Sequence, residues 1–310
     1  MLSLGETPLT ERDRGLSASL LSALGGEVPP PFAVRRFGPL PTFSYGDGDR
    51  HTGGPAEREF GKHVDQTNYS VVVGDQVVVK WLTTPAPMPH PTPDVFAHLV
   101  RAGFEDTAPP YAALTRADKS GEVLLALVTG YLPQARDGWE WCVDEAEAGR
   151  TGFAADLGRL AADLHLALST FPRSDGDRTR DPSLREAGAR AEGALLEALG
   201  LTGGEDGAWL ASRAADLRHE LEPLARPITS PLIRIHGDLH VGQILRWRDG
   251  YAVIDFDGNP TVTRASPYQP AARDVAQLAT SLEHVAQVAI SRRGTPPGEA
   301  VRWAREARDA

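Results

Sequence analysis

Cysteine is nearly absent from this chain of 310 residues, which contains Cys142 alone. A single thiol cannot form an intramolecular disulfide, so the fold does not require an oxidising compartment. A lone cysteine is more often a small buried side chain than a reactive thiol, because free cysteine is among the most buried residue types. We therefore expect Cys142 in the core and give it no chemical role.

Long apolar stretches are also missing. No segment approaches the ~20 consecutive apolar residues that a membrane-spanning helix needs. Residues 1–6 lack the basic region and the apolar core of a secretory signal. We expect a cytoplasmic protein that has no membrane partner.

Positive charge is the third deficit, with 32 lysines and arginines against 42 aspartates and glutamates. The formal net charge of −10 argues against nucleic acid as a partner, because nucleic-acid-binding proteins present extended basic surfaces. A nucleotide can still bind locally, since backbone N–H groups and one or two cations suffice to hold its phosphates. The expected ligands are therefore small molecules, and the chain is compatible with a monomer or a homodimer.

Strand patterns dominate the first half of the sequence. Residues 69–73 and 76–81 are rich in β-branched side chains, and Gly74-Asp75 between them suits a two-residue hairpin turn. Further segments with the composition of strands lie at 32–37, 111–116 and 122–132, and helices are predicted at 10–24 and 94–102.

The second half has helical spacing instead. Apolar residues recur every three or four positions over 152–170, which predicts an amphipathic helix. Further helical patterns lie at 183–200, 206–224, 271–292 and 297–309, with two short strands at 233–236 and 251–256. His165 on the first of these helices is expected to be structural.

A β-rich part followed by a helical part indicates the α+β class. We predict two lobes joined near residues 128–134. The N-terminal lobe spans 1–132, including a short cap over about 1–58, and the helical C-terminal lobe spans 133–310. The junction between two such lobes is a common place for a ligand-binding cleft.

Two aspartates stand where short apolar strands end. Asp238 lies in a polar turn and Asp255 at the end of the next apolar segment. A buried acid is costly unless it is paired or binds a metal. Gln243 adds a neutral oxygen, and Mg²⁺ prefers a few hard oxygen ligands from the protein, with phosphates and water supplying the rest. Either aspartate alone could simply cap a turn, but the three residues together match what phosphoryl transfer needs.

The sequence around these residues resembles a known family. Residues 236–243 read His-Gly-Asp-Leu-His-Val-Gly-Gln and residues 254–258 read Ile-Asp-Phe-Asp-Gly. This pattern resembles the signature of aminoglycoside phosphotransferase-like kinases, and within them the maltokinase and bacterial glucosamine kinase group. The similarity also includes 65–72, 137–139 and 164–168, and it covers roughly residues 60 to 285. It implies a two-lobed protein-kinase-like fold, with a β-rich N-lobe that has one main helix, and it implies ATP and Mg²⁺ as cofactors.

The resemblance also implies a role for each matching residue. Asp238 is expected to be the catalytic base, and Gln243 and Asp255 are expected to hold Mg²⁺. Lys80 is expected to contact the α- and β-phosphates, beneath a loop at 61–68 that covers them. The remaining expected nucleotide contacts, from the strand after that loop and from the hinge, are Asn68, Ser70, Val128, Gly130 and Leu132.

The family lysine is expected to have an acidic partner on the following helix. Phe96 stands near the position where that acid is expected, and Asp94 is the available acid on the helix. We therefore count Asp94 among the nucleotide-binding candidates, as the possible partner of Lys80.

The acceptor is expected to contact Asp238, His240, Asp257 and Asn259. Asp257 has two alternative roles. It recognises a sugar hydroxyl or amino group, or it forms an ion pair with Arg264 or Arg273. For Trp139 and Trp141, stacking on a sugar is possible, although aromatic core residues are commoner.

The predicted function is phosphorylation of a hydroxyl on a small sugar-like acceptor: a monosaccharide, an amino sugar such as glucosamine, or a cyclitol. One alternative is an aminoglycoside antibiotic phosphotransferase, with which the net charge of −10 is compatible. Another is a nucleotide-binding pseudokinase without turnover. The presence of Asp238, Gln243 and Asp255 argues against the pseudokinase, because a scaffold does not need all three.

Overall fold

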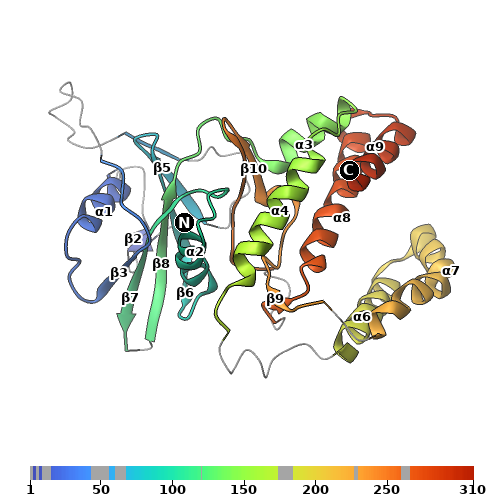
Figure 1. Ribbon diagram of the computed structural model, residues 1–310, viewed down its shortest axis with the longest axis horizontal. Helices are drawn as coiled ribbons and strands as arrows, with labels where there is room; N and C mark the ends of the chain where they lie inside the picture. Colours follow the sequence, from blue (N-terminus) through green and yellow to red (C-terminus); the bar gives the residue numbers. More distant parts are fainter. Residues whose placement is uncertain are drawn as a thin grey trace.

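The computed structural model describes residues 3–4, 7–8, 15–42, 56–59, 68–119, 121–173, 184–226, 230–259 and 266–310. Figure 1 shows a part built around a β-sheet on the left and a mostly helical part on the right. This arrangement confirms the predicted α+β class.

Two valine-rich segments form the predicted hairpin in this sheet. Strand β5 (Tyr69–Val73) pairs antiparallel with β6 (Val77–Pro87), and Val73 lies opposite Val77. The turn therefore has three residues rather than the predicted two. Gly74 and Asp75 both have left-handed backbone angles, with φ of 59° and 50°. Glycine and aspartate tolerate this region better than most residues do, which explains why the chain reverses there.

The hairpin belongs to a six-stranded antiparallel sheet with the order β3-β7-β8-β6-β5-β4. The predicted strands are present with shifted ends, as β3 (Phe32–Arg36), β7 (Pro110–Asp118) and β8 (Gly121–Gly130). The edge strand β4 (Glu57–Glu59) lies in a segment for which no strand was predicted. A separate two-stranded pairing joins β1 (Ser3–Leu4) to β2 (Thr7–Pro8).

The two faces of the sheet belong to different cores, because successive strand side chains point to opposite faces. Helix α1 (Leu16–Leu24) covers one face, where its leucines pack against Val73 and Val128. Helix α2 (Pro91–Ala102) covers the other face, where Leu127 belongs to the same core as the helical lobe. The second core therefore joins the two lobes.

Helix α2 begins three residues earlier than predicted. His90 caps its N-terminus by accepting a hydrogen bond from the Thr92 N–H, and Pro91 occupies the first turn, where its missing N–H has no cost. Gly103, with φ of 70°, ends the helix at the predicted residue.

The helical lobe contains most of the predicted helices. They are α4 (Ala154–Ser169), α6 (Leu184–Leu201), α7 (Gly204–Leu221), α8 (Ala272–Val288) and α9 (Pro297–Asp309). A short 3₁₀ turn, η2 (Glu222–Ala225), follows α7, and a π turn, η4 (Ala289–Arg293), extends α8. Helix α3 (Gly138–Glu147) was not predicted. None of the helices in the described ranges is long and apolar enough to cross a membrane.

Short strands flank the segments that contain Asp238, Gln243 and Asp255. Strand β9 (Ile233–Arg234) pairs with β12 (Tyr268–Gln269), and β10 (Ile244–Trp247) pairs with β11 (Gly250–Val253). A 3₁₀ turn, η3 (Val241–Gln243), leads into β10. The predicted strands at 233–236 and 251–256 are thus shorter in the structure.

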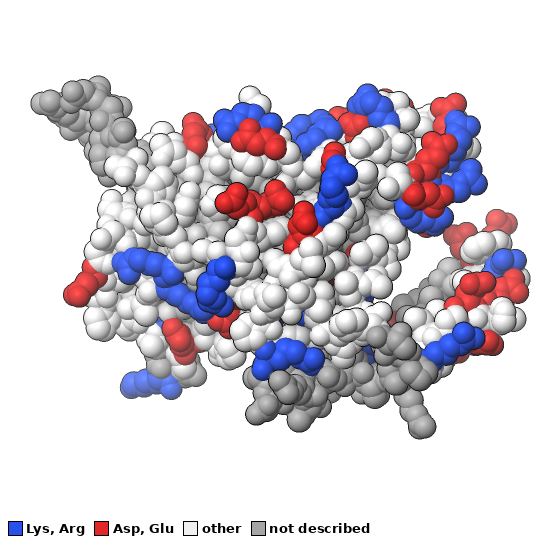
Figure 2. Space-filling view, in the orientation of Figure 1, with Lys and Arg blue, Asp and Glu red and all other residues white. Residues whose placement is uncertain are grey.

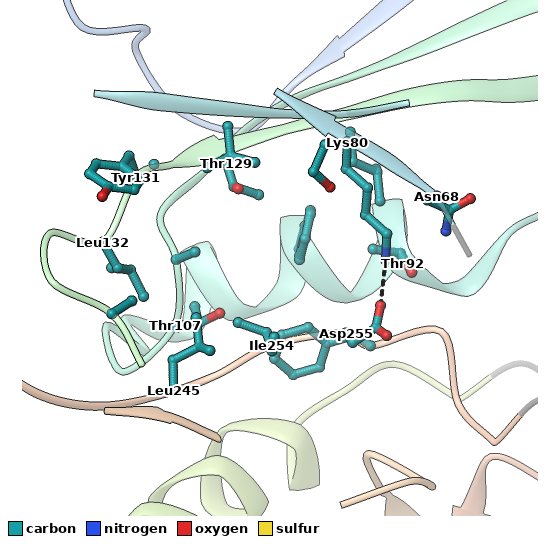
Figure 3. Close-up of a pocket in the computed structure, with 18 of the residues that line it drawn as sticks. Asn68, Lys80, Thr92, Thr107, Thr129, Tyr131, Leu132, Leu245, Ile254 and Asp255 are labelled. Atoms are coloured by element: carbon teal, nitrogen blue, oxygen red, sulfur yellow. Dashed lines mark hydrogen bonds and ion pairs between the residues drawn. The ribbon is translucent and has the colours of Figure 1, made fainter. Parts of the chain in front are cut away.

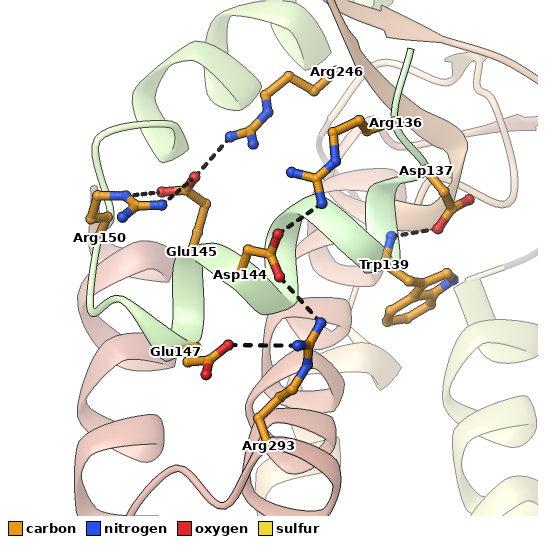
Figure 4. Close-up of polar contacts among 9 residues, drawn as sticks. All are labelled: Arg136, Asp137, Trp139, Asp144, Glu145, Glu147, Arg150, Arg246 and Arg293. Carbon is orange, nitrogen blue, oxygen red and sulfur yellow. Dashed lines mark hydrogen bonds and ion pairs between the residues drawn. The ribbon is translucent and has the colours of Figure 1, made fainter. Parts of the chain in front are cut away.

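Ion pairs fasten α3 to its neighbours (Figure 4). Arg246 on β10 lies 2.8 Å from Glu145, Arg136 lies 2.7 Å from Asp144, and Arg293 of η4 lies 3.3 Å from Asp144. On the face in Figure 2, acidic and basic side chains likewise alternate over the helical lobe. These contacts hold α3 against both β10 and the end of α8.

The N-terminus of α3 also approaches the turn η3 very closely. A Cβ atom on Gly138 would lie 1.6 Å from the backbone oxygen of Val241 and 2.9 Å from that of Ile244. The neighbouring Trp141, which is fully buried, donates from its indole nitrogen to the Ile244 oxygen at 3.0 Å. Only glycine therefore allows α3 to reach this depth.

We expect Gly138→Ala to destabilise the protein by about 2 kcal/mol or more, because the added methyl must displace backbone rather than a flexible side chain. Gly158→Ala is the control, since nothing lies within 4 Å of a Cβ at that helical position. Urea unfolding should show the control unchanged or slightly stabilised. A Gly138→Ala variant as stable as the original chain would show that this approach is not tight.

Candidate active site

A cavity of about 490 Å³ lies between the sheet and the helical lobe. This size is typical of small-ligand sites. Figure 3 places Tyr131 and Leu132, where the chain leaves the sheet, at one end of the cavity. Asn68, Lys80 and Asp255 lie at the other end. The cavity thus has the connection between the lobes at one end and the charged side chains of Lys80 and Asp255 at the other.

Most of the predicted nucleotide-binding residues line this cavity, but Val128 and Asp94 are not among the described residues in its wall. Asn68, Ser70, Lys80, Gly130 and Leu132 all contribute to its walls. Val128 is fully buried on the opposite face of the sheet, beneath α1. Its neighbours in β8, Leu127 and Thr129, face the cavity, so strand alternation directs the Val128 side chain away from it. Of the predicted phosphate-covering loop at 61–68, residues 61–67 lie outside the described residues.

The connection between the lobes contains one backbone N–H group without a hydrogen-bond partner in the described part of the chain. The Gly130 N–H donates to the Pro109 oxygen at 2.8 Å, and the Tyr131 N–H donates to the Gln76 oxygen at 2.8 Å. Within the described part of the chain, the Leu132 N–H has no hydrogen-bond partner. Leu132 lines the cavity, so a ligand can use this donor.

Lys80 reaches across the cavity to the helical lobe. Its Nζ lies 2.5 Å from Asp255 Oδ1 and 3.6 Å from Asp257 Oδ2. Burial disfavours the charged amine, but the two carboxylates outweigh it, and the pKa of Lys80 stands above its ordinary value. The candidate partner Asp94 instead forms an ion pair with Arg35 at 2.6 Å. Asp94 is not among the described residues that line the cavity. The acids that contact Lys80 are instead Asp255 and Asp257, from the helical lobe.

Asp257 is fixed by contacts other than the predicted arginine pairs. Its carboxylate accepts a hydrogen bond from Thr92 Oγ1 at the start of α2 and faces Lys80. Burial would raise the pKa of Asp257, but the Lys80 charge and the Thr92 hydrogen bond hold it below its ordinary value. Arg273 donates to the Gly237 oxygen at 2.8 Å, and Arg264 lies outside the described residues.

Asp255 and Gln243 are brought together through the backbone. The Ile254 N–H donates to the backbone oxygen of Gln243 at 2.9 Å, which places Gln243 beside the segment that contains Asp255. Asp255 has φ of 67°, a left-handed conformation that is uncommon for a residue other than glycine and that occurs often at functional sites.

This pair suits Mg²⁺ by the chemistry of its donors. One carboxylate and one amide oxygen are hard ligands, and Mg²⁺ usually takes only one or two such groups from protein. The described residues contain no cluster of three or more His, Cys, Asp or Glu side chains that could hold a metal ion by themselves. A metal at Gln243 and Asp255 would therefore take further ligands from phosphate and water.

Asp238 presents its two carboxylate oxygens differently. Oδ1 accepts hydrogen bonds from Asn259 Nδ2 at 2.9 Å and from Gln277 Nε2 at 2.6 Å. Oδ2 lies 3.7 Å from His240 Nε2. Because His240 Nδ1 accepts the Gly242 N–H at 3.1 Å, its proton belongs on Nε2. Burial lowers the pKa of His240, which keeps the ring neutral.

The tryptophans predicted near the site have different positions. Trp141 is a fully buried core residue, as its more common role suggested. Trp139 stacks on the ring of His240, with centroids 5.6 Å apart and an angle of 29° between the rings. It thereby holds His240 in place beside Asp238.

A residue that sequence reasoning missed organises this loop. Asp274 on α8 is fully buried and accepts the His236 N–H at 2.8 Å and the Gly237 N–H at 2.9 Å. His165 Nε2 lies 3.0 Å from the same carboxylate, which confirms the structural role expected for this histidine. Burial opposes the charge of Asp274, but the His165 hydrogen bond and the nearby His236 outweigh it and lower its pKa.

A sequence signal for this arrangement exists. Asp274, Gln277 and Ser281 recur at intervals of three and four, which places them on one face of α8. That face also contains the buried Leu278 and Leu282. Polar residues within an apolar helical stripe are expected to have buried partners, and here those partners are the residues of the Asp238 loop.

Comparison with known proteins identifies the sequence family. Residues 58–292 match a family described as the phosphotransferase enzyme family. A glucosamine kinase of Streptacidiphilus jiangxiensis is 41% identical over 256 residues, which are 77% of this chain and 57% of that protein. A glucosamine kinase of Mycolicibacterium smegmatis is 38% identical over 242 residues, which are 73% of this chain and 59% of that protein. The chain thus spans less than two thirds of the length of these relatives.

The fold has a solved counterpart at higher coverage. A structure of glucosamine kinase in complex with glucosamine, ADP and inorganic phosphate superposes with a TM-score of 0.71 at 32% identity. The superposition covers 96% of this chain and 70% of that one. This match confirms the predicted two-lobed architecture.

We expect Asp274→Asn to destabilise the protein by about 3 kcal/mol at neutral pH, because it weakens buried hydrogen bonds to a charged acceptor. The folded-state pKa of Asp274 is lowered, so its stabilisation is present above the ordinary aspartate pKa of about 4 and is lost as pH falls through the lowered value. Urea unfolding should therefore show a difference in the free energy of unfolding between the original chain and the variant, and this difference should become smaller in acid. A difference that is absent at neutral pH, or that becomes larger in acid, would contradict this role.

Proposed function

The chain belongs to the phosphotransferase enzyme family, and on that premise we propose that it is a kinase that uses ATP and Mg²⁺ to phosphorylate a hydroxyl of a small sugar. Among monosaccharides, amino sugars and cyclitols, an amino sugar such as glucosamine is the first candidate, because the curated relatives are glucosamine kinases. The observation that carries the proposal is the pair of facing side chains Asp238 and His240 beside a cavity lined by Lys80 and Asp255. Their turn adjoins the cavity wall, because His236 Nε2 lies 3.0 Å from the backbone oxygen of Ile254, which lines the cavity.

An acceptor hydroxyl can bridge Asp238 and His240 from the side. Their facing atoms, Oδ2 and Nε2, are 3.7 Å apart, too far for a direct hydrogen bond. One atom is an acceptor and the other a donor, so a hydroxyl can donate to Oδ2 and accept from Nε2. This geometry supports the substrate-binding role that the sequence predicted for His240.

The chemical step then follows from the placement of Asp238. Oδ2 takes the proton of the acceptor hydroxyl as the hydroxyl oxygen forms a bond to the γ-phosphorus of ATP. The bond between that phosphorus and the β–γ bridging oxygen breaks, and ADP leaves with the electron pair. No oxidation or reduction is involved.

The cavity accommodates the nucleotide with its base toward the hinge. The Leu132 N–H offers a donor to the adenine ring, and Asn68 and Lys80 lie at the opposite end, toward the phosphates. Ser70, which also lines the cavity, is paired with Lys80 across the hairpin. When phosphates occupy that end, Lys80 can exchange its bond with Asp255 for a phosphate oxygen while keeping Asp257 as a neighbouring carboxylate. Gln243 and Asp255 would hold Mg²⁺, which neutralises charge on the phosphates.

The central experiment is an assay of ADP production with ATP, Mg²⁺ and a panel of monosaccharides, amino sugars, cyclitols and aminoglycosides. We expect turnover with an amino sugar. We expect Asp238→Asn to lower kcat by at least about 100-fold, since general-base catalysis typically contributes 10²- to 10⁴-fold, and to leave ADP affinity nearly unchanged.

Asp249→Asn is the matched control, because Asp249 lies in the exposed turn between β10 and β11 and contacts Arg248. Selective turnover of an aminoglycoside would replace the proposed acceptor class. Turnover of nothing in the panel, or an Asp238→Asn variant active within a factor of a few, would reject the proposed mechanism.

A second prediction concerns the metal. In the original chain, Mg²⁺ should strengthen ADP binding in calorimetric titrations. In Asp255→Ala this strengthening should disappear, while binding without Mg²⁺ is retained because Lys80 is released to the phosphates. Asp249→Ala should behave like the original chain. If Asp255→Ala keeps the full Mg²⁺ effect, Asp255 is not a metal ligand.

A further inference from the structure

The orientation of Asp238 is set by two amide side chains from separate parts of the helical lobe. Asn259 follows β11 by a short segment, and Gln277 lies on α8. Both donate to the same carboxylate oxygen, Oδ1, at 2.9 Å and 2.6 Å. Sequence reasoning assigned Asn259 to the acceptor and did not identify Gln277.

Two donors fill one oxygen and leave the other available. A carboxylate oxygen has two lone-pair positions, so Asn259 and Gln277 together satisfy Oδ1. Oδ2 accepts no hydrogen bond from the described part of the chain, and His240 Nε2 lies 3.7 Å from it. The two oxygens of Asp238 are therefore not equivalent.

Such a constraint is needed because rotation about χ2 of an aspartate, the torsion that turns the carboxylate, is only weakly restricted. The carboxylate rotates about its terminal bond through a broad, roughly two-fold energy profile. Without fixed donors, neither the plane of the group nor the identity of the outward oxygen is determined. Proton abstraction is sensitive to this geometry, since the base must lie within hydrogen-bonding reach of the hydroxyl.

The donor from α8 is itself well positioned. Gln277 lies one turn after Asp274, which holds the backbone of His236 and Gly237. One further turn along the helix, Ser281 Oγ accepts the Val241 N–H at 3.1 Å. The helix therefore fixes the main chain on both sides of Asp238, and Gln277 fixes its side chain.

We propose that Gln277 and Asn259 are positioning residues that hold Oδ1 of Asp238, so that Oδ2 alone receives the proton of the acceptor hydroxyl. This inference rests on the proposed kinase function. The hydroxyl oxygen forms its bond to the γ-phosphorus, the bond to the β–γ bridging oxygen breaks, and the proton goes to Oδ2. The two amides contact neither reacting atom and act only through Asp238.

The test uses Gln277→Met, which keeps the length of the side chain and removes the donor. We expect kcat for the acceptor found in the panel to fall about 10- to 100-fold, a part of the usual contribution of a general base. KM for ATP and the midpoint of urea unfolding should stay unchanged. Gln287→Met is the control, since Gln287 lies on an exposed face of the same helix.

Two further variants distinguish positioning from simple packing. Gln277→Glu should lower kcat more than Gln277→Met, because it replaces a donor with a negative charge beside Asp238. Combining Gln277→Met with Asn259→Leu should reduce kcat by less than the product of the two separate reductions, because both residues hold one oxygen. Unchanged kcat in Gln277→Met and Gln277→Glu would overturn the proposal, as would a loss expressed only in KM for ATP.

The proposal can fail separately from the kinase function. If the original chain phosphorylates nothing, the kinase function fails, and the positioning role is then tested by crystal structures alone. A rotated Asp238 carboxylate in Gln277→Met, with an unchanged one in Gln287→Met, would support the proposal. An Asp238 carboxylate that keeps its orientation in both variants would overturn it.

Discussion

The site depends on the buried carboxylate of Asp274. Its two oxygens accept the N–H groups of His236 and Gly237, so the turn that presents Asp238 is attached to helix α8 rather than free at the surface. A buried carboxylate is stable only with such partners, and His165 supplies a further one. Since α8 packs in the same core as α4 and α9, the position of the proposed base is determined by the packing of the whole helical lobe.

The second constraint acts between the lobes. Lys80 extends from the sheet to Asp255 and Asp257 on the helical side, and Thr92 at the start of α2 contacts Asp257 as well. Two elements of the N-terminal part of the chain, β6 and α2, thus contact a segment more than 150 residues later in the sequence. The same segment is tied to Gln243 through the backbone of Ile254. The residues proposed to bind the nucleotide, the metal and the acceptor would therefore lie near one another, although different parts of the fold hold them in position.

The sequence was sufficient for features that depend on local pattern. The β-branched hairpin, the amphipathic helix that became α4 and the spacing of Asp238, Gln243 and Asp255 all follow from composition or motif. Features that depend on long-range packing could not be read in this way. The orientation of Val128 requires the register of β8, and the ion pair of Asp94 with Arg35 requires β3 and α2 to be placed together. Helix α3 was missed because charged residues interrupt its apolar spacing, and the turn at Gly74 proved one residue longer because its pairing begins at Val77.

The most direct test of these proposed roles is a crystal structure of this chain with Mg²⁺, ADP and glucosamine. We predict adenine beside the Leu132 N–H, the metal at Gln243 and Asp255, and a sugar hydroxyl bridging Asp238 Oδ2 and His240 Nε2. Nucleotide or sugar bound outside this cleft, or a sugar hydroxyl that meets Oδ1 instead of Oδ2, would contradict these roles.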